Sequence, residues 1–424
     1  MIDRPVSSLL RRLLAALALL LLAPWAHAAW FIWETIELPL SSGAACGNGT
    51  PYRFFVNRTP LNNHLAITFE GGGACWDQDA CEGIGAYSAT NPDGIPADYM
   101  SLPNSAAGGL VTPFSARVDP FEGVRTQDWT LVYMPYCTGD VHTGNLVHVY
   151  NDKRPDQPRV QYHRGQANVQ AAADWMRKNL GRPGNMLLTG FSAGGVGSTS
   201  NYAVLRDKLA PKGRSTLMAD SGPLMNAPRG NTKEQSPSQP LHELIRASWG
   251  LDLPGGMIPT LSAKLPGLDI NNMGSLNGAL ARHYPKDRFG YLLFQQDGIF
   301  SGFSYLDFFP DIANETDPKK QKQMLNVLWR QDIAAWLPSL DAEPNISYHV
   351  PFFRDFNESH CLTIVDFSGT GIQEKGIASA GTFVNNGLDR KPPMRNVEQD
   401  QVSDLTQPLS IALEILAIVL DIFG

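Results

Sequence analysis

Ser192 is the residue of this chain best placed to act as a nucleophile, because a glycine stands two positions before it and another two positions after it. The apolar residues 185–188 predict a buried strand before this G-x-S-x-G pattern, and residues 196–209 predict a helix after it. A serine in such a strand-to-helix turn lies in strained backbone, and glycine lets the two elements approach closely. The setting predicts a nucleophile elbow for acyl transfer. The alternative is a glycine-rich turn with an exposed serine.

A serine hydroxyl is a poor nucleophile, so it needs a base that accepts its proton and an acid that orients the base. We predict that His360 is the base and Asp297 the acid, because both follow predicted strands. Ser192, Asp297 and His360 also occur in the chain order of α/β-hydrolase triads.

Other histidines and aspartates compete for these two roles. The competing histidines after residue 28 are His64, His142, His148, His163, His242, His283 and His349. We interpret His349 as a structural histidine inside a strand, whereas His142 and His163 lie near the predicted cleft and are candidates for substrate binding. Asp220 follows an earlier predicted strand and is the main alternative acid, and chain order does not decide between it and Asp297. Two weaker alternatives are Asp355 and Asp140.

Three consecutive glycines form the second chemical feature of the predicted site. Residues 71–73 follow residues 65–69, an apolar run that predicts the third strand of the sheet, buried on both faces. In α/β-type serine hydrolases a loop at this place carries an oxyanion donor. The backbone N–H groups of Ala193 and of Gly72 or Gly73 are therefore predicted to stabilise the tetrahedral oxyanion, each by ~3 kcal/mol. The alternative is a flexible connector.

The elements that position these residues alternate between strand and helix patterns. Strands are predicted at 33–40, 52–56, 65–69, 130–134, 185–188, 215–219, 289–294 and 347–353, and helices at 166–180, 196–209, 241–249 and 319–337. The first two strands are expected to be antiparallel. The rest predicts an α/β-hydrolase-like fold, with a mostly parallel sheet flanked by helices and the site at the carboxyl ends of its strands. We interpret residues 29–424 as a single catalytic domain with a cap-like insertion at about 223–287.

The N-terminus has the pattern of a cleaved secretory signal peptide over residues 1–28. Arg11 and Arg12 precede an apolar run that is too short to span a membrane, and Ala26-His27-Ala28 fits the cleavage pattern. We therefore expect a secreted or periplasmic protein. The formal net charge is −7, and removal of residues 1–28 takes away a net +2 to leave −9. Because the chain also lacks a basic run, nucleic acid is a poor candidate for a partner.

The C-terminal stretch 408–424 is apolar but contains Glu414 and Asp421, so we interpret it as a buried helix rather than a membrane span.

Five cysteines follow the predicted signal peptide. Cys75 and Cys81 are predicted to staple one loop in an oxidising compartment, and the odd number leaves at least one cysteine unpaired or intermolecular. The partners of Cys46, Cys137 and Cys361 stay open. The cysteine spacing is not that of a zinc site, and no His-Glu-x-x-His motif accompanies it, so neither a metal nor another cofactor is predicted.

Taken together, these motifs resemble the pectin acetylesterase and Notum family of carboxylesterases. The matching stretches are 46–51, 69–73 with Cys75 and Cys81, 134–141, 190–195, 219–222 and the segments around Asp297 and His360. The resemblance implies an α/β-hydrolase-like fold without metal and the hydrolysis of O-acyl esters. It also implies that Ser192 is the nucleophile, Asp297 the acid and His360 the base, and that residues 219–222 lie outside the triad. The implied oxyanion pair is Gly73, or its neighbour Gly72, with Ala193.

The chain differs from the Notum-like pattern beside the glycines. Notum-like members have a tryptophan directly after the paired glycines, whereas Ala74 follows Gly73 here and the tryptophan is Trp76. Trp76 and His142 are the candidate substrate contacts. Plant members share the three glycines but have more cysteines, so the resemblance is to a bacterial member.

The sequence thus leads to three functional hypotheses. The first is an exported serine esterase that removes short acyl groups, above all acetyl, from a polysaccharide such as pectin. The second is an esterase for lipid, acylated-protein or polyester substrates. The third belongs to another class: a catalytically inactive protein that binds glycans.

Overall fold

A computed structural model of the protein describes residues 30–101, 112–117, 122–390, 394–400 and 409–410. Its largest element is a nine-stranded sheet with the strand order β1-β2-β4-β3-β7-β8-β9-β10-β11. β1 pairs antiparallel with β2 and β2 with β4, whereas every other neighbouring pair is parallel. The strands are β1 (Trp33–Glu37), β2 (Arg53–Asn57), β3 (Leu65–Phe69), β4 (Thr130–Met134), β7 (Met186–Phe191), β8 (Ser215–Asp220), β9 (Arg288–Leu292), β10 (Ile346–Val350) and β11 (Val397–Glu398). The predicted α/β class, with its antiparallel start and mostly parallel sheet, is confirmed.

Helices cover both faces of the sheet because the buried strands carry apolar residues on both sides. Ile67 and Leu188 belong to the core on the face of α4 (Gly165–Asn179) and α5 (Ala193–Leu209). Their neighbours Ala66 and Leu187 belong to a second core, which includes residues of α12 (Ala380–Asp389). This arrangement satisfies the requirement that a parallel strand is buried on both faces.

The strand register brings the carboxyl ends of several strands to one edge of the sheet. Phe69 at the end of β3 pairs with Met134 of β4 and with Gly190 of β7. Further along, Phe191 pairs with Asp220 at the end of β8, and Asp220 pairs with Leu292 of β9. The loops that follow these strands are therefore close in space, although they are far apart in the sequence.

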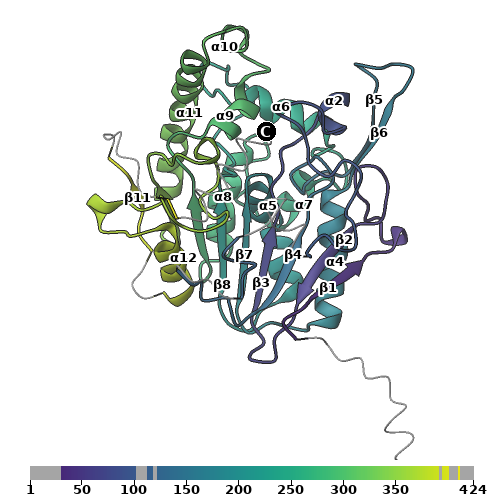
Figure 1. The fold of residues 1–424 in the computed structure, drawn as a ribbon, viewed down its shortest axis with the longest axis vertical. Helices are drawn as coiled ribbons and strands as arrows, with labels where there is room; N and C mark the ends of the chain where they lie inside the picture. The colour runs from purple at the N-terminus through teal and green to yellow at the C-terminus, as the bar shows by residue number, and fades with distance from the viewer. Residues whose placement is uncertain (1–29, 102–111, 118–121, 391–393, 401–408, 411–424) are drawn as a thin grey trace, which may run out of the picture.

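Shorter helices gather beyond this edge of the sheet, at the upper ends of the strands in Figure 1. They include α2 (Gln78–Cys81), α6 (Gln239–Ser248), α9 (Gly298–Tyr305) and α10 (Pro310–Ala313). The segment 223–287 contains α6 together with α7 (Met257–Lys264) and α8 (Leu276–His283). The long helix α11 (Pro318–Asp341) rises beside them, and the separate hairpin of β5 (Leu146–Tyr150) and β6 (Arg159–His163) projects at the upper right.

The ends of some elements differ from the sequence prediction for local reasons. The first strand stops at Glu37 because residues 40–42 turn into a short 3-10 helix. The elbow strand runs on to Phe191, three residues past its predicted end, and α5 starts at Ala193, three residues before its predicted start. The turn between them is therefore a single residue, Ser192.

Two predicted features lie outside the described residues: the signal peptide at 1–28 and most of the apolar tail at 408–424. In the described part of the chain, no helix combines the length and the apolar character that a membrane span requires.

Candidate active site

Ser192 occupies the one-residue turn between β7 and α5 in a conformation that side chains other than glycine rarely adopt, with φ 56° and ψ −126°. Its N–H donates to the Asp220 carbonyl oxygen at 2.9 Å, which ties the turn to the end of β8. A Cβ atom at Gly194 would lie 2.1 Å from the Phe69 carbonyl oxygen, so only glycine allows the helix to approach β3 this closely. These features are those of a nucleophile elbow.

His360 and Asp297 form a buried pair. The Nδ1 atom of His360 lies 2.8 Å from Oδ2 and 3.1 Å from Oδ1 of Asp297. The two side chains are 6% and 0% exposed, so water does not compete for this interaction. A carboxylate at Nδ1 fixes the tautomer with the proton on Nδ1 and leaves Nε2 as the acceptor. His360 Nε2 is buried and has no hydrogen-bond partner among the described residues.

Asp297 reaches this position because it caps the helix that follows β9. It is the N-cap residue of α9, and its Oδ1 accepts the Phe300 N–H at 2.8 Å. A carboxylate is favoured at a helix N-terminus, where free N–H groups and the helix dipole are both available. Asp297 is therefore held by the same helix that carries Phe300, Phe303 and Ser304 into the neighbouring pocket.

The loop that carries His360, residues 354–363, is anchored to the end of β8. We call it the histidine loop. Its hydrogen bonds to the Asp220 and Ser221 side chains have lengths of 2.8–3.0 Å and come from Cys361 N–H, Leu362 N–H, Thr363 N–H and the Thr363 hydroxyl. Asp220 also accepts the Ser221 hydroxyl at 2.9 Å. Burial raises the pKa of Asp220, and these hydrogen bonds act against that rise.

Asp220 therefore contacts the chain after His360 and not the imidazole itself. Its backbone carbonyl binds the Ser192 turn, while its side chain binds the histidine loop. Asp220 thus connects the predicted nucleophile and the predicted base. The sequence raised it only as an alternative acid, and no sequence pattern indicated this connecting position.

Arg354 is a second anchor of the histidine loop that the sequence did not indicate. It is 2% exposed, and its guanidinium donates to the carbonyl oxygens of Cys361 and Ser368. Its backbone N–H donates to the Ser359 hydroxyl at 3.0 Å. Burial lowers the pKa of Arg354 to about 10, partly opposed by the charge of Asp220.

The glycine loop after β3 lies next to the elbow. Gly73 lines the same pocket as Ser192 and Ala193. Gly72 does not line the pocket, and its carbonyl accepts the Thr90 N–H at 2.9 Å. Both glycines have positive φ, 133° and 71°, which only glycine adopts without strain.

Glu70 holds the base of the glycine loop. Its carboxyl group accepts the Tyr136 N–H and the Tyr99 hydroxyl, each at 2.7 Å. Burial raises the pKa of Glu70 to about 8, although these hydrogen bonds lower it.

His142 supports the same loop from behind and is not a pocket residue. Its Nε2 lies 2.9 Å from the Glu70 carbonyl oxygen, and its ring packs against Phe69 and Tyr136. The side chain is 2% exposed, and desolvation lowers its pKa to about 4. His142 is not among the residues that line the pocket, so the geometry does not support the expectation that it contacts substrate.

Two other histidines named by the sequence are also buried structural residues. His163 binds the Thr138 carbonyl oxygen through Nδ1 and the Tyr150 hydroxyl through Nε2. His349 lies in β10 and binds the Thr370 carbonyl oxygen at 2.7 Å, which confirms its interpretation as a structural histidine inside a strand.

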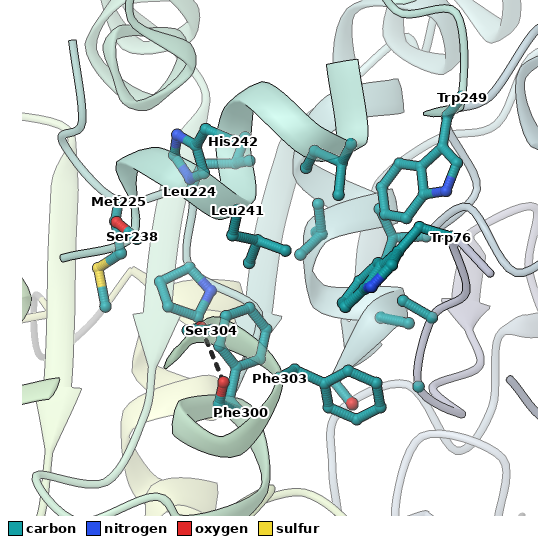
Figure 2. Close-up of a pocket in the computed structure, with 18 residues that line it drawn as sticks. Trp76, Leu224, Met225, Ser238, Leu241, His242, Trp249, Phe300, Phe303 and Ser304 are labelled. Atoms are coloured by element: carbon teal, nitrogen blue, oxygen red, sulfur yellow. Dashed lines mark hydrogen bonds between the residues drawn. The ribbon is translucent and has the colours of Figure 1, made fainter. Parts of the chain in front are cut away.

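A pocket opens beside Ser192 with a cavity volume of about 60 Å³, and the empty space reaches about 620 Å³ when the part open to solvent is included. Its wall is apolar and includes Leu241, Ile245 and Trp249 from α6 and its end, and Phe300 and Phe303 from α9. Trp76 lies next to Trp249 in the pocket wall (Figure 2). The Trp249 indole donates to the Cys75 carbonyl oxygen at 2.8 Å, which joins α6 to the chain after the glycine loop. Apart from Ser192, the polar side chains in the wall are Ser238, His242 and Ser304.

The cysteines form two disulfides. Cys75 pairs with Cys81, as predicted, and Cys46 pairs with Cys137. Cys361 is buried and free. Cys75 and Cys81 also lie within metal-ligand distance of His163, but a disulfide offers no thiolate, so this group does not fit a metal ion.

Comparisons with known proteins agree on family and fold. A family model described as Pectinacetylesterase matches residues 33–248. The Palmitoleoyl-protein carboxylesterase NOTUM of Schmidtea mediterranea is 21% identical over 222 residues, which cover 51% of this chain and 35% of that protein. The protein of the same name from Mus musculus is 22% identical over 192 residues, covering 44% of this chain and 35% of the relative. The matched part thus spans about a third of the length of these curated relatives.

A solved structure extends the likeness to most of the chain. The structure of the Wnt deacylase Notum from Drosophila has a TM-score of 0.57 and 17% identity, and it covers 89% of this chain and 99% of that one. At this level of identity the likeness concerns the fold, which is that of an α/β hydrolase.

Proposed function

Because this chain belongs to the pectinacetylesterase family, we propose that it is a serine carboxylesterase whose triad is Ser192, His360 and Asp297. The observation that carries the proposal is the buried His360–Asp297 pair, with its Nδ1 to Oδ2 distance of 2.8 Å. This pair leaves Nε2 of His360 as an acceptor, and Ser192 occupies the strained turn that such enzymes use for their nucleophile.

In the proposed reaction Ser192 Oγ attacks the ester carbonyl carbon while its proton passes to His360 Nε2. The tetrahedral intermediate then collapses, the bond from carbon to the alcohol oxygen breaks, and His360 returns the proton to the leaving alcohol. A water molecule attacks the acyl-enzyme, again with His360 as base, and the free acid leaves as Ser192 regains its proton. Asp297 stabilises the imidazolium that forms in both halves.

The oxyanion in this proposal is stabilised by the N–H groups of Gly73 and Ala193. Both residues line the pocket beside Ser192, which supports Gly73 over Gly72 as the second donor. Each donor is worth ~3 kcal/mol of transition-state stabilisation in related chemistry.

For the substrate we propose an ester of an apolar acyl chain longer than acetyl. The pocket beside Ser192 and Ala193 is walled by large apolar side chains, and an acetyl group would leave most of that wall without contact. This favours the class of lipid, acylated-protein or polyester substrates over acetylated pectin. We further propose that the segment 223–287 acts as a cap, because its helix α6 forms one wall of the pocket.

We also propose that the enzyme works outside the cytoplasm, in the periplasm or as a secreted protein. The signal-peptide pattern at residues 1–28 supports export. The two disulfides support it too, because such bonds persist in oxidising compartments.

A series of p-nitrophenyl esters from acetyl to palmitoyl tests both parts of the proposal. We expect Ser192→Ala to lower kcat by about 10⁴-fold or more while the circular dichroism spectrum is unchanged. In the wild type, kcat/KM should rise about fourfold per added methylene while the chain gains contact with the pocket. Wild-type turnover in Ser192→Ala would refute the triad. Faster release of acetate from acetylated pectin than hydrolysis of any longer ester would refute the acyl-chain proposal, and no turnover of any ester would favour a glycan-binding protein.

A further inference from the structure

One wall of the apolar pocket contains a polar strip on α6. Ser238 at the start of the helix and His242 one turn later both line the pocket, and their positions four residues apart place them on one face of the helix. They are 2% and 6% exposed. Figure 2 shows both on the side of Leu224 and Met225, across the pocket from Trp76. We call Ser238 and His242 the polar strip.

His242 has an unused hydrogen-bonding atom in this strip. Its Nδ1 is buried and has no hydrogen-bond partner among the described residues. Burial, together with the nearby charge of Arg246, lowers the pKa of His242 to about 4, so the ring is neutral at neutral pH. A neutral imidazole offers one donor and one acceptor.

The Ser238 hydroxyl faces the Asp332 carboxyl group and lowers the pKa of that group as a hydrogen-bond donor, beside the Ser238 backbone N–H, which donates to Asp332 at 2.9 Å. What this hydroxyl offers to the pocket is therefore its oxygen as an acceptor. The Ser304 hydroxyl donates to the Phe300 carbonyl oxygen at 2.8 Å, as the dashed line in Figure 2 shows.

Folded proteins rarely keep buried polar atoms without partners, so a group that enters the pocket is the expected partner of the polar strip. We propose that the polar strip binds a hydroxyl group on the acyl chain of the substrate, so that the enzyme prefers hydroxyacyl esters. This inference rests on the proposed esterase function and narrows its substrate class.

A hydroxyl group fits the strip better than a charged group does. It donates and accepts at once, which matches a neutral imidazole and a serine hydroxyl. A carboxylate would require a free cation, but the nearby Arg246 guanidinium is already bound by Asp252 at 2.9 and 3.0 Å and donates to the Ile270 carbonyl oxygen. The other pocket walls are apolar and offer a charge no compensation.

An acyl chain without a hydroxyl would cover the strip and leave Nδ1 of His242 unpaired. Sites built to hydrogen-bond a substrate hydroxyl discriminate strongly against analogues that lack it. The preference is therefore measurable as a ratio of kcat/KM values between two esters that differ by a single oxygen atom.

The test compares octanoyl esters of one alcohol with isomers that carry one hydroxyl near the carbonyl, in the middle or at the far end of the chain. In the wild-type full chain we expect kcat/KM for at least one hydroxylated isomer to exceed that for the plain ester by about tenfold, equivalent to ~1.4 kcal/mol. His242→Leu should reduce this ratio to about one, and Ser238→Ala should reduce it in part. Ile245→Leu, on the same helix and in the same pocket, should keep the preference because it changes only apolar shape.

Binding of the free acids provides a second measurement that needs no turnover. Calorimetric titration of octanoate and the hydroxyoctanoates should give the same order of affinity in the wild type and the same loss in His242→Leu. The inference would be overturned if the octanoyl ester were hydrolysed, and octanoate bound, at least as well as every hydroxylated isomer. A preference that survives both His242→Leu and Ser238→Ala would overturn it as well. If no ester is turned over, the esterase proposal fails, and the titration alone decides the inference.

Discussion

The sheet edge around Ser192 and the pocket wall on α6 and α9 are built in opposite ways. At the edge, a network of hydrogen bonds holds most of the polar groups: the Asp220 side chain accepts four, and His360 is fixed by Asp297 through Nδ1, while its Nε2 has no partner among the described residues. In the wall, large apolar side chains dominate, and Nδ1 of His242 has no hydrogen-bond partner among the described residues. In the function that we propose, the edge positions the reacting atoms, whereas the wall selects substrates by the shape and polarity of their acyl chains.

This difference implies that the two regions respond differently to substitution. Changes at the edge should reduce the rate for every substrate, because they displace or disable the catalytic groups. Changes in the wall should alter the ranking of substrates, because contacts with the acyl chain differ between them.

The largest effect that we expect separates the two aspartates at the edge. Asp297→Asn should lower kcat by about 10⁴-fold with little change in melting temperature, because the amide no longer fixes the productive histidine tautomer. Asp220→Asn should lower the melting temperature as well as the rate, since its carboxylate holds the histidine loop. Ester hydrolysis and thermal unfolding of both variants measure the two effects. A crippled Asp220→Asn beside a fully active Asp297→Asn would reverse our assignment of the acid.

The two disulfides belong to different regions and close loops of different length. Cys46–Cys137, with a sequence separation of 91, ends in the loop after β4 at the sheet edge, and Cys75–Cys81, with a separation of 6, lies beside the pocket. From loop closure in the unfolded chain, we expect removal of Cys46–Cys137 to cost about 4–5 kcal/mol and removal of Cys75–Cys81 about 2 kcal/mol.

Urea unfolding of the paired alanine variants checks this order. We further expect the Cys75–Cys81 variant to change the acyl-chain profile, because Trp249 is bound to the Cys75 carbonyl oxygen. Equal losses of stability, or an unchanged profile, would show that the two disulfides do not differ in this way.

A pH-dependent effect on stability concerns Asp332, which holds the start of the pocket wall. Its carboxyl group accepts the Ser238 N–H at 2.9 Å and the Tyr305 hydroxyl at 2.8 Å, and burial raises its pKa to about 6 from an ordinary 3.8. The folded state keeps the proton on Asp332 to a higher pH than the unfolded state does. The contribution of Asp332 to the free energy of unfolding therefore falls as the pH rises from about 4 to 6.

Asp332→Asn does not titrate, so it reveals the contribution of this group. Relative to the variant, the free energy of unfolding of the wild type should fall by up to about 3 kcal/mol between pH 4 and pH 7. Urea titrations at several pH values measure the difference, and parallel pH profiles for the two proteins would contradict the assignment.

The sequence supported the prediction of the sheet and of the candidate residues at its edge, because both depend on local patterns. Apolar runs such as residues 65–69 and 130–134 coincide with β3 and β4 to the residue. The turn at Ser192 is encoded by its own glycines, and the Cys75–Cys81 disulfide by its short spacing. The pairing of His360 with Asp297 was expected from their positions after predicted strands and from the family resemblance, because chain order alone left Asp220 open. The geometry supports this expectation.

The pocket wall could not be predicted in this way, since its residues are scattered and their types are ordinary core types. His242 looked like one histidine among eight, and only the packing of α6 shows that its Nδ1 lacks a partner among the described residues. His142, in contrast, seemed close to the cleft in sequence but lies behind the glycine loop. Asp220 and Arg354 act through contacts with residues 359–368, which no local pattern in their own segments reveals.

The strained turn at Ser192 gives a direct readout of the folded population. Its φ of 56° is imposed by β7 and α5, and the groups proposed to activate its hydroxyl follow two other strands, β9 and β10. In an unfolded chain the Ser192 hydroxyl has only the low reactivity of a serine without an adjacent base. A serine-directed fluorophosphonate label should therefore count native molecules one by one, and the labelled fraction should follow the unfolding curve of the sheet.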